Sequence, residues 1–300
     1  MIKSNRREFI TGAACAAAAS MTHSLNAAAE NPLDVWQKET DLVLPDTYRQ
    51  YLKDGNTRGF AALEKLEKGF ERIVEEIRTV KIGETPAVWN VYNMGYIIKT
   101  QEALFSIDLV HRRAEELAEI LDFSLVTHNH GDHFHAGLYN LMNKAGKTVI
   151  SNFLDNYGAH FKKNIGGYTR APKTFKLKDV EIRTSLIDHN GYLTDFTTAF
   201  EIKCNSYIIY HTGDSGWGTE KKLGTTFGQA DLWLFFPGCG INPGKAVEIV
   251  KPKRISIGHI WELGHKHNSR LTSKMVRGAI AEAKKNCPDV SAGYWGERIV

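Results

Sequence analysis

The chain has 300 residues, of which 42% are hydrophobic and 24% are charged, close to the average for soluble globular proteins. This composition excludes a disordered chain, a collagen-like repeat and a disulfide-stapled mini-protein. The chain contains no run of about 18 apolar residues, which is the length that an ordinary transmembrane helix needs. The formal net charge of +4 is too small to predict a nucleic-acid partner.

The first 29 residues have the features of an export leader. Two arginines, Arg6 and Arg7, precede a short Ala-rich run over residues 12–19, and Ala27 and Ala29 supply the small residues expected before a cleavage site. The segment resembles a bacterial twin-arginine signal, with an Ala-rich amphipathic helix as the alternative. The resemblance implies that the Tat export machinery is a partner and that the mature protein is periplasmic. It also implies no stable membrane insertion after the leader is removed.

The mature chain is expected to have two parts, a helical N-terminal extension over residues 30–80 and a larger domain over residues 81–300. Residues 30–57 show no clear hydrophobic period. From residue 58 to 80, apolar residues recur on one face of a helix and charged residues on the other. We expect this helix to dock on the core rather than on a membrane, because its polar face is acidic near Glu75.

Beyond residue 83 the pattern changes to short apolar strands that later alternate with helices. Strands are expected at 88–92, 96–99, 104–109, 123–126, 147–151, 180–187, 197–203, 207–211, 232–236, 254–258 and 290–294. Helices are expected at 111–121, 245–250 and 271–284. Strand pairs followed by strand–helix alternation predict an α/β protein with two sheets packed face to face and helices outside, an αββα sandwich.

Three cysteines remain in the mature chain: Cys204, Cys239 and Cys287. An odd number leaves at least one thiol unpaired even in an oxidising compartment. Their spacing does not indicate a zinc knuckle. We therefore expect buried free thiols, with a single disulfide among them as the alternative.

The segment from His128 to His133 carries the clearest chemical signal in the chain. It reads His-x-His-x-Asp-His, a pattern expected by chance in about one in a thousand chains of this composition. It follows a predicted buried strand, and α/β sheets place ligands at the carboxyl ends of their strands. Imidazole and carboxylate are the donors that zinc and similar ions prefer. The candidate ligands are His128, His130, Asp132 and His133. Gly131 is expected to allow the tight turn that lets them converge.

Four side chains cannot complete two metal sites, so further ligands must come from elsewhere. Three candidates stand at the ends of predicted strands: His189, Asp214 and His259. Each histidine alone would more often be a packed or surface residue, but as a set at strand ends they indicate ligands.

The remaining histidines are weaker candidates. His211 lies within a strand, so we expect it in the core. His265 and His267 lie in a polar turn. Either is an alternative to His259 as a metal ligand, but His259 is favoured because it directly ends its strand. His265 is also a candidate for binding substrate in the pocket.

The ordered set of seven positions resembles the metallo-β-lactamase superfamily, whose pattern is His-x-His-x-Asp-His followed by His, Asp and His at successive strand ends. The match covers roughly residues 81–300. The resemblance implies that this range is an αββα catalytic domain that binds two divalent metal ions. Zinc is expected first, with iron or manganese as alternatives. The implied ligands are His128, His130 and His189 for the first metal, Asp132, His133 and His259 for the second, and Asp214 as the bridge. The spacing from His133 to His189 and the Thr-Gly-Asp-Ser turn resemble the lactonase and glyoxalase II-like hydrolases of this group.

The resemblance implies an enzyme, a dinuclear metal-dependent hydrolase. Two such ions can share a hydroxide and lower its pKa toward neutrality, and Asp132 is the expected catalytic group that orients this hydroxide and moves its proton. The expected substrate is a small molecule with an ester, lactone, thioester or phosphoester bond. A β-lactamase is an alternative, although lactam-cleaving members generally lack a carboxylate equivalent to Asp214. A di-iron redox protein is another, although no flavin domain or replacement of a ligand histidine by carboxylate is visible.

A basic segment between the motif and His189 could select an anionic substrate. Residues 156–177 contain five basic residues and no acidic one. Lys163 and Arg170 are therefore candidate substrate-binding residues that would pair with a phosphate or carboxylate. The alternative is a solvated surface loop.

The leader is tested by changing its arginine pair. Replacing Arg6 and Arg7 by lysine should leave the protein in the cytoplasm with its leader attached, because the signal depends on both arginines. The measurement is the distribution of full-length and processed protein between cytoplasm and periplasm. Undiminished processed protein in the periplasm of that variant would contradict the export assignment.

Overall fold

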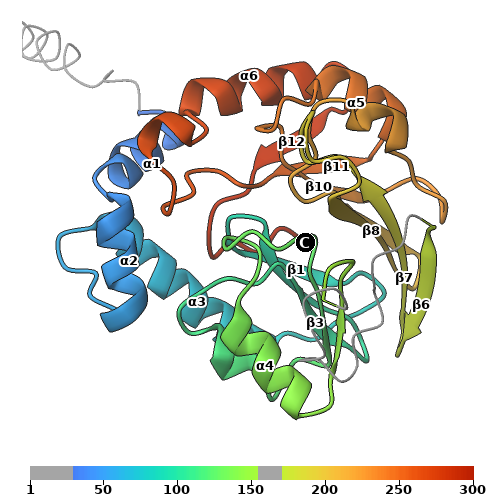
Figure 1. Cartoon of the computed structure of the whole chain (residues 1–300), viewed down its shortest axis with the longest axis horizontal. Helices are drawn as coiled ribbons and strands as arrows, with labels where there is room; N and C mark the ends of the chain where they lie inside the picture. Colours follow the sequence, from blue (N-terminus) through green and yellow to red (C-terminus); the bar gives the residue numbers. More distant parts are fainter. Residues whose placement is uncertain (1–29, 155–170) are drawn as a thin grey trace, which may run out of the picture.

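The computed structural model describes residues 30–154 and 171–300. The predicted export leader and the two candidate basic residues, Lys163 and Arg170, lie outside the described residues. Two sheets pack face to face with helices on their outer sides, which confirms the αββα prediction (Figure 1). Among the described helices, none is both long and apolar enough to cross a membrane.

The first sheet has five strands in the order β1-β2-β3-β4-β5. They are β1 (Ala87–Tyr92), β2 (Gly95–Lys99), β3 (Leu104–Ile107), β4 (Phe123–Leu125) and β5 (Thr148–Ile150). Strands β1 to β3 are antiparallel, and β3, β4 and β5 run parallel. Nearly every strand residue is buried, as expected when one face meets a second sheet and helices cover the other. Here α3 (Ala61–Thr79) contacts β1, and α4 (Ala136–Lys144) contacts β5.

The second sheet has seven strands in the order β12-β11-β10-β9-β8-β7-β6. They are β6 (Lys173–Leu177), β7 (Val180–Ile187), β8 (Thr197–Cys204), β9 (Tyr207–His211), β10 (Leu232–Phe235), β11 (Arg254–Ile257) and β12 (Asp289–Ala292). Strands β6 to β9 are antiparallel, and β9 to β12 run parallel. Helices α5 (Pro243–Val250) and α6 (Ser273–Ala283) lie on its outer side (Figure 1).

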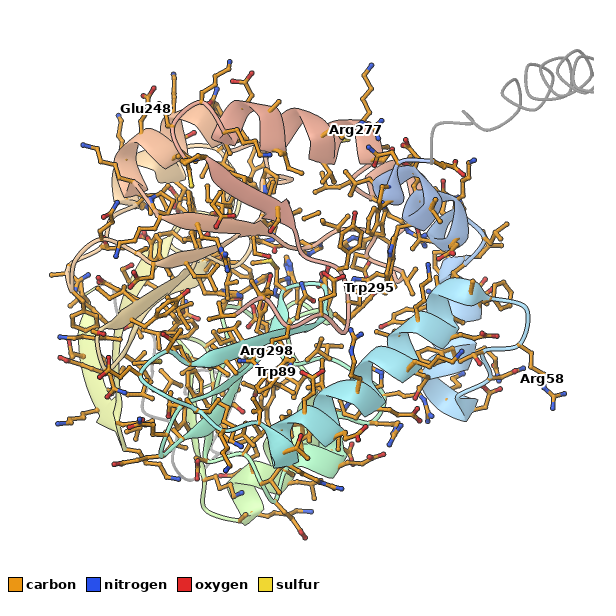
Figure 2. The ribbon with its side chains drawn as sticks, turned by 180° about the vertical axis from the view of Figure 1, so that it is seen from behind. Arg58, Trp89, Glu248, Arg277, Trp295 and Arg298 are labelled. Atoms are coloured by element: carbon orange, nitrogen blue, oxygen red, sulfur yellow. The ribbon has the colours of Figure 1, made fainter. Side chains whose placement is uncertain are left out.

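Helices α1 (Pro32–Asp41) and α2 (Pro45–Asp54) precede α3 in the N-terminal segment. Asn31 caps α1, because its Oδ1 accepts the Leu33 N–H at 3.0 Å. The apolar face expected for the helix at 58–80 is the buried face of α3. This helix lies beside β1, where Trp89 Nε1 donates to Glu76 Oε2 at 2.7 Å (Figure 2).

The structure corrects the helix predicted at 111–121. Only a short 3₁₀ helix, η1 (Ala114–Leu117), forms there. His111 is buried and stacks on Phe70, with ring centroids 4.1 Å apart. Its Nδ1 accepts the Arg113 N–H at 3.2 Å, so the side chain competes with the backbone where the helix would start.

No separate bounds were predicted for α4, β6, α1 and α2, although α1 and α2 lie within the helical extension expected over residues 30–80. The two helices bury only two residues each, Leu33 and Thr40 in α1 and Tyr48 and Tyr51 in α2, which is too few to produce a visible hydrophobic period. Strand β6 contains two lysines and forms the edge of its sheet. It has no continuous apolar face, so only its pairing with β7 reveals it.

Arg270 joins the N-terminal helices to the segment that follows β11. The side chain is only 5% exposed. Its guanidinium donates to the carbonyls of Thr40 and Val43 at 2.8 Å each, and to those of Leu263 and His265 at 3.0 Å each. A buried guanidinium is tolerated only when its donors are paired, so these bonds fix the position of residues 263–270.

We expect Arg270→Ala to lower the free energy of unfolding by about 3 kcal/mol or more, because several buried carbonyls lose their donor. The matched control is Arg277→Ala. Arg277 also joins this region to α1, through Asp34, but its side chain is 41% exposed, so its loss should cost below about 1 kcal/mol. Urea unfolding followed by circular dichroism measures both. Equal losses would show that Arg270 has no special role.

Candidate metal centre

Loops that follow the ends of four strands bring the seven predicted ligands together. The loop after β4 carries residues 128–133, while His189, Asp214 and His259 follow β7, β9 and β11. The side chains form two adjacent groups, and the donor atoms within each group lie within 4.8 Å of one another. The first group is His128, His130 and His189, and the second is Asp132, His133, Asp214 and His259.

Asp214 lies between the two groups. Its Oδ2 is 3.5 Å from His189 Nε2 in the first group and 3.4 Å from His259 Nε2 in the second. Its Oδ1 is 3.2 Å from His133 Nε2. One carboxylate is therefore adjacent to the donor atoms of both groups, which is the position of a bridging ligand in a two-metal site.

The donor atoms of this cluster fit metal ions. Four of them are buried and make no hydrogen bond: His128 Nε2, His133 Nε2, His189 Nε2 and Asp214 Oδ1. Buried polar atoms without partners are rare in folded proteins. Here they face one another in groups of the size and donor type that zinc binds. The residues present therefore fit two divalent cations.

Burial and the carboxylates act in opposite directions on the protonation of the histidines in this cluster. Burial lowers the pKa of His128 well below its usual value. Burial opposes ionisation of Asp214, but the charges of His259 and His133 outweigh it and hold the pKa of that carboxyl well below normal. Burial lowers the pKa of His259, but the carboxylates of Asp214 and Asp132 outweigh burial and raise this pKa to about 10. Metal ions compete with protons for such donors, so the same carboxylates that favour protonated histidines also favour bound cations.

Asp108, which follows β3, supports two ligands from behind and was not predicted. It is fully buried, and its Oδ2 accepts the Nδ1–H of His133 at 2.8 Å. The same oxygen accepts the Thr127 hydroxyl at 2.6 Å, and Thr127 Oγ1 in turn accepts Nδ1–H of His128 at 2.9 Å. These bonds leave Nε2 of both histidines free to bind metal, as outer-shell carboxylates do in metalloproteins. The backbone of Asp108 has a φ of 44°, a strained conformation that costs about 1–3 kcal/mol.

Asn93 is a second unpredicted member of the site. The sequence indicated only a turn between β1 and β2, but this turn reaches the second metal group. Asn93 Nδ2 lies 3.0 Å from Asp132 Oδ2 and 3.2 Å from His259 Nε2, and its carbonyl accepts the His259 N–H at 3.1 Å. Both Asn93 and His259 have positive φ angles, of 59° and 55°, so the two strained residues hold each other in place.

The glycine next to Asp214 is required by space, whereas the glycine in the motif is not. Gly213 has a φ of 49°, and a Cβ there would lie 2.8 Å from Thr127 Oγ1. At Gly131 a Cβ would meet nothing within 4 Å, and its φ is outside the left-handed region. The tight turn expected at Gly131 is present, but its backbone conformation does not require a glycine.

The metal groups open into a pocket of about 490 Å³. His265 lines this pocket, and its Nδ1 lies 3.2 Å from Glu262 Oε2. Glu262 is 3% exposed and accepts the Tyr92 hydroxyl at 3.2 Å, so the histidine is anchored by a residue that is itself fixed. The polar turn therefore lies at the pocket, as expected for His265, whereas His259 belongs to the second metal group.

The other histidine and cysteine predictions can be compared with the structure. His211 is fully buried, and its Nε2 contacts the Met94 carbonyl at 3.1 Å, which confirms a core position. The three described cysteines are all free thiols. Cys204 and Cys287 are buried, but Cys239 is only half-buried and lines the pocket, 4.0 Å from His189 Nδ1.

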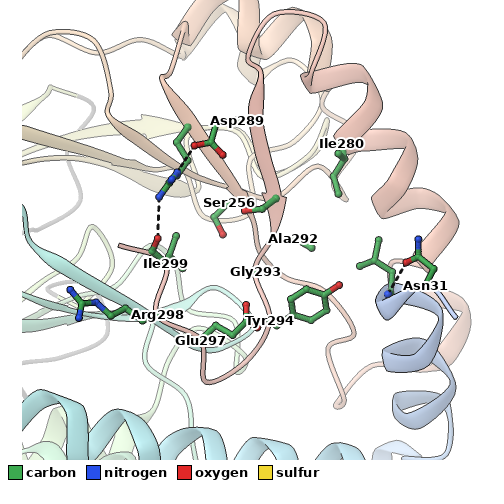
Figure 3. A pocket seen from close by; sticks show the side chains of 13 residues that line it. Asn31, Ser256, Ile280, Asp289, Ala292, Gly293, Tyr294, Glu297, Arg298 and Ile299 are labelled. Carbon is green, nitrogen blue, oxygen red and sulfur yellow. Dashed lines mark hydrogen bonds and ion pairs between the residues drawn. The ribbon is translucent and has the colours of Figure 1, made fainter. Parts of the chain in front are cut away.

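A second cavity, of about 520 Å³, lies between α1, α6, β12 and the C-terminal segment (Figure 3). None of the seven clustered ligands lines it. Arg254 in its wall is engaged by Asp289 at 2.7 Å and by the Ile299 carbonyl at 3.1 Å. Among the described residues, the candidate metal ligands that line a cavity therefore face the first pocket and not this one.

Comparison with known proteins supports the fold and the chemical class. No family model matches the chain. A UPF0173 metal-dependent hydrolase of Pelotomaculum thermopropionicum is 27% identical over 202 residues, covering 61% of this chain and 86% of that protein. The metallo-β-lactamase fold protein YhfI from Bacillus subtilis superposes with a TM-score of 0.52 at 17% identity, covering 71% of this chain and 98% of the other. CmlA, a diiron β-hydroxylase from Streptomyces venezuelae, superposes with a TM-score of 0.51 at 15% identity, covering 82% of this chain and 61% of CmlA. The chain therefore has the metallo-β-lactamase fold, and its sequence is similar to that of a metal-dependent hydrolase.

We expect Asp108→Ala to lower the affinity for zinc by about 10–100-fold, because His133 and His128 lose the network that orients their rings. The control is Asp231→Ala. Asp231 accepts the Ile208 N–H at 2.8 Å and pairs with Lys253, and it belongs to neither metal group. Competition with a chromophoric chelator measures the affinity of both variants. A normal zinc affinity in Asp108→Ala would exclude the orienting role.

Proposed function

We propose that the protein is a dinuclear metal-dependent hydrolase that cleaves an ester, lactone, thioester or phosphoester bond of a small molecule. The observation that carries this proposal is the pair of donor groups that share Asp214, with four buried donor atoms making no hydrogen bond. Zinc is the first candidate for both positions because the donors are imidazole and carboxylate, and iron and manganese are alternatives.

When bound, divalent cations supply Lewis-acid activation of a water molecule and of the electrophilic oxygen of the substrate. Asp132 lines the pocket, and its Oδ2 accepts a hydrogen bond from Asn93 Nδ2 at 3.0 Å. Its second oxygen, Oδ1, is the proposed acceptor for the proton of the attacking water. His265, whose ring centroid lies 6.3 Å from that of His259, is oriented by Glu262 and is the proposed hydrogen-bonding partner of the substrate.

A di-iron redox protein is the second candidate. The chain shares its fold with CmlA, and iron accepts the same imidazole and carboxylate donors. Iron content and visible absorption of the purified protein separate the two functions. A β-lactamase is less favoured, because the lactam-cleaving members of the superfamily that this sequence resembles generally lack a carboxylate equivalent to Asp214.

We also propose that the enzyme acts in the periplasm after export through the Tat pathway. The support is the arginine pair and the alanine-flanked cleavage site of residues 1–29. Export of a folded chain would allow the metal ions to be inserted before transport.

We expect Asp214→Ala to reduce the metal content from two ions per chain to one or fewer and to abolish hydrolysis. The shared carboxylate offsets the repulsion between the two cations, and the second group would retain only three donors. The control is Asp188→Asn, which alters a carboxylate that directly follows β7 and pairs with Lys222 instead. Mass spectrometry measures zinc, iron and manganese in proteins purified identically. Two metals retained in an active Asp214→Ala variant would exclude the bridging role.

A further inference from the structure

The wall of the pocket beside His259 has its own chemical character. It is formed by residues that follow β10 and β11 and by the first turn of α6. We propose that this wall binds the apolar acyl chain of an uncharged substrate, so that the substrate class is neutral acyl esters and lactones rather than phosphoesters. The inference rests on the proposed hydrolase function and names its substrate class.

Apolar side chains lie directly beside the metal ligands on this wall. The Phe236 ring stacks on the imidazole of His259, with centroids 4.1 Å apart and planes inclined by 20°. Leu271 and Met275 also line this pocket. Phe236 and Leu271 are each 7% exposed, whereas Met275 is 52% exposed although it is a large apolar residue. A chain that extends from the metal groups along Phe236 would bury Met275 and gain hydrophobic free energy.

Charged groups in the described lining are already engaged. Arg270 is the one lysine or arginine among the described residues that line the pocket, and its guanidinium is directed to four backbone carbonyls. Glu262 accepts the N–H groups of Gly264 and His265 as well as the Tyr92 hydroxyl. Because binding an anion requires donors that are free to face it, this lining favours an uncharged substrate.

The first turn of α6, which borders the pocket, also offers few free donors. The Ser273 N–H donates to Gln37 Oε1 at 2.6 Å, and the Met275 N–H donates to Thr272 Oγ1 at 3.2 Å. These backbone groups would otherwise attract a phosphate or carboxylate. Their engagement leaves the Met275 side chain as the feature that this turn presents to a ligand.

Two exposed aromatic side chains, Trp217 and Tyr192, lie on the loops that carry Asp214 and His189. Trp217 is 70% exposed, its N–H donates to the Cys239 carbonyl at 3.1 Å, and its ring packs on Gly191. Tyr192 lies on the same loop as Gly191, between β7 and β8, and is 96% exposed. Exposed aromatic side chains next to a ligand pocket are typical of a binding surface.

The first experiment measures hydrolysis by the zinc-loaded mature protein. The substrates are p-nitrophenyl acetate, butyrate and octanoate, with bis(p-nitrophenyl) phosphate as the anionic comparison. Each buried methylene contributes about fourfold in binding, so kcat/KM should rise at least tenfold from acetate to octanoate and should be lowest for the phosphodiester. Values that do not change with chain length, or a preference for the phosphodiester, would overturn the inference.

The second experiment is binding of two neutral, unhydrolysed probes, butanamide and octanamide, measured by titration calorimetry. We expect octanamide to bind at least tenfold more tightly. Met275→Glu should remove this difference, because it places a carboxylate against the chain, and Met275→Leu should retain it. The control, Ile249→Glu, alters an exposed apolar residue of α5 that does not line the pocket and should bind both amides as the unmodified protein does.

The two experiments separate the inference from the function on which it rests. Chain-length-dependent amide binding that is lost in Met275→Glu, with no hydrolysis of any ester, would support the acyl-binding wall and reject the hydrolase. Ester hydrolysis with equal rates for acetate and octanoate, and equal binding of both amides, would support the hydrolase and reject the wall.

Discussion

The burial of three carboxylates within one small volume is the constraint on which the rest of the structure depends. Asp108 and Asp214 are almost completely removed from water, and Asp132 is largely so. Ionised carboxylates in such a position are unstable unless positive charge and hydrogen-bond donors surround them. The imidazoles, the Asn93 amide and the Thr127 hydroxyl provide those donors. They come from loops on both sheets, so the face-to-face packing of the sheets and the chemistry of the site require each other. The positive φ angles of Asn93, Asp108 and His259 show that this requirement outweighs local backbone preference.

Features that depend on residues close together in the chain could be predicted from the sequence, whereas features that depend on distant contacts could not. Strands β7 and β9 have the predicted bounds, and the helix expected at 58–80 is present as α3, because their patterns repeat within a few residues. The seven candidate ligands could be proposed because they follow strand ends and carry donors that metals prefer. Asp108 and Asn93 could not, because their partners are distant in the chain. Nothing near Asn93 in the sequence indicates contact with His259. The helix expected at 111–121 failed for the same reason, since His111 is placed by Phe70.

The N-terminal helices shape the pocket although they contribute no metal ligand. Tyr48 of α2 packs on Tyr92, with ring centroids 5.7 Å apart, and Tyr92 donates to Glu262, which positions His265. Arg270 makes a parallel connection from the carbonyls near the end of α1 to the same loop. A change in these helices would therefore alter the loop that carries Glu262, His265 and Arg270 before it altered the candidate metal groups.

The lysines of β6 have a consequence for the behaviour of the protein at high concentration. This strand is the outer edge of the seven-stranded sheet, and a bare edge offers backbone groups to which a second molecule could add a strand. Lys176 is exposed on β6, and Lys173 is partly exposed at its start. Two copies that approached edge to edge would bring these like charges together, which opposes sheet extension between molecules. The same residues that obscured the strand in the sequence thus protect the protein from self-association.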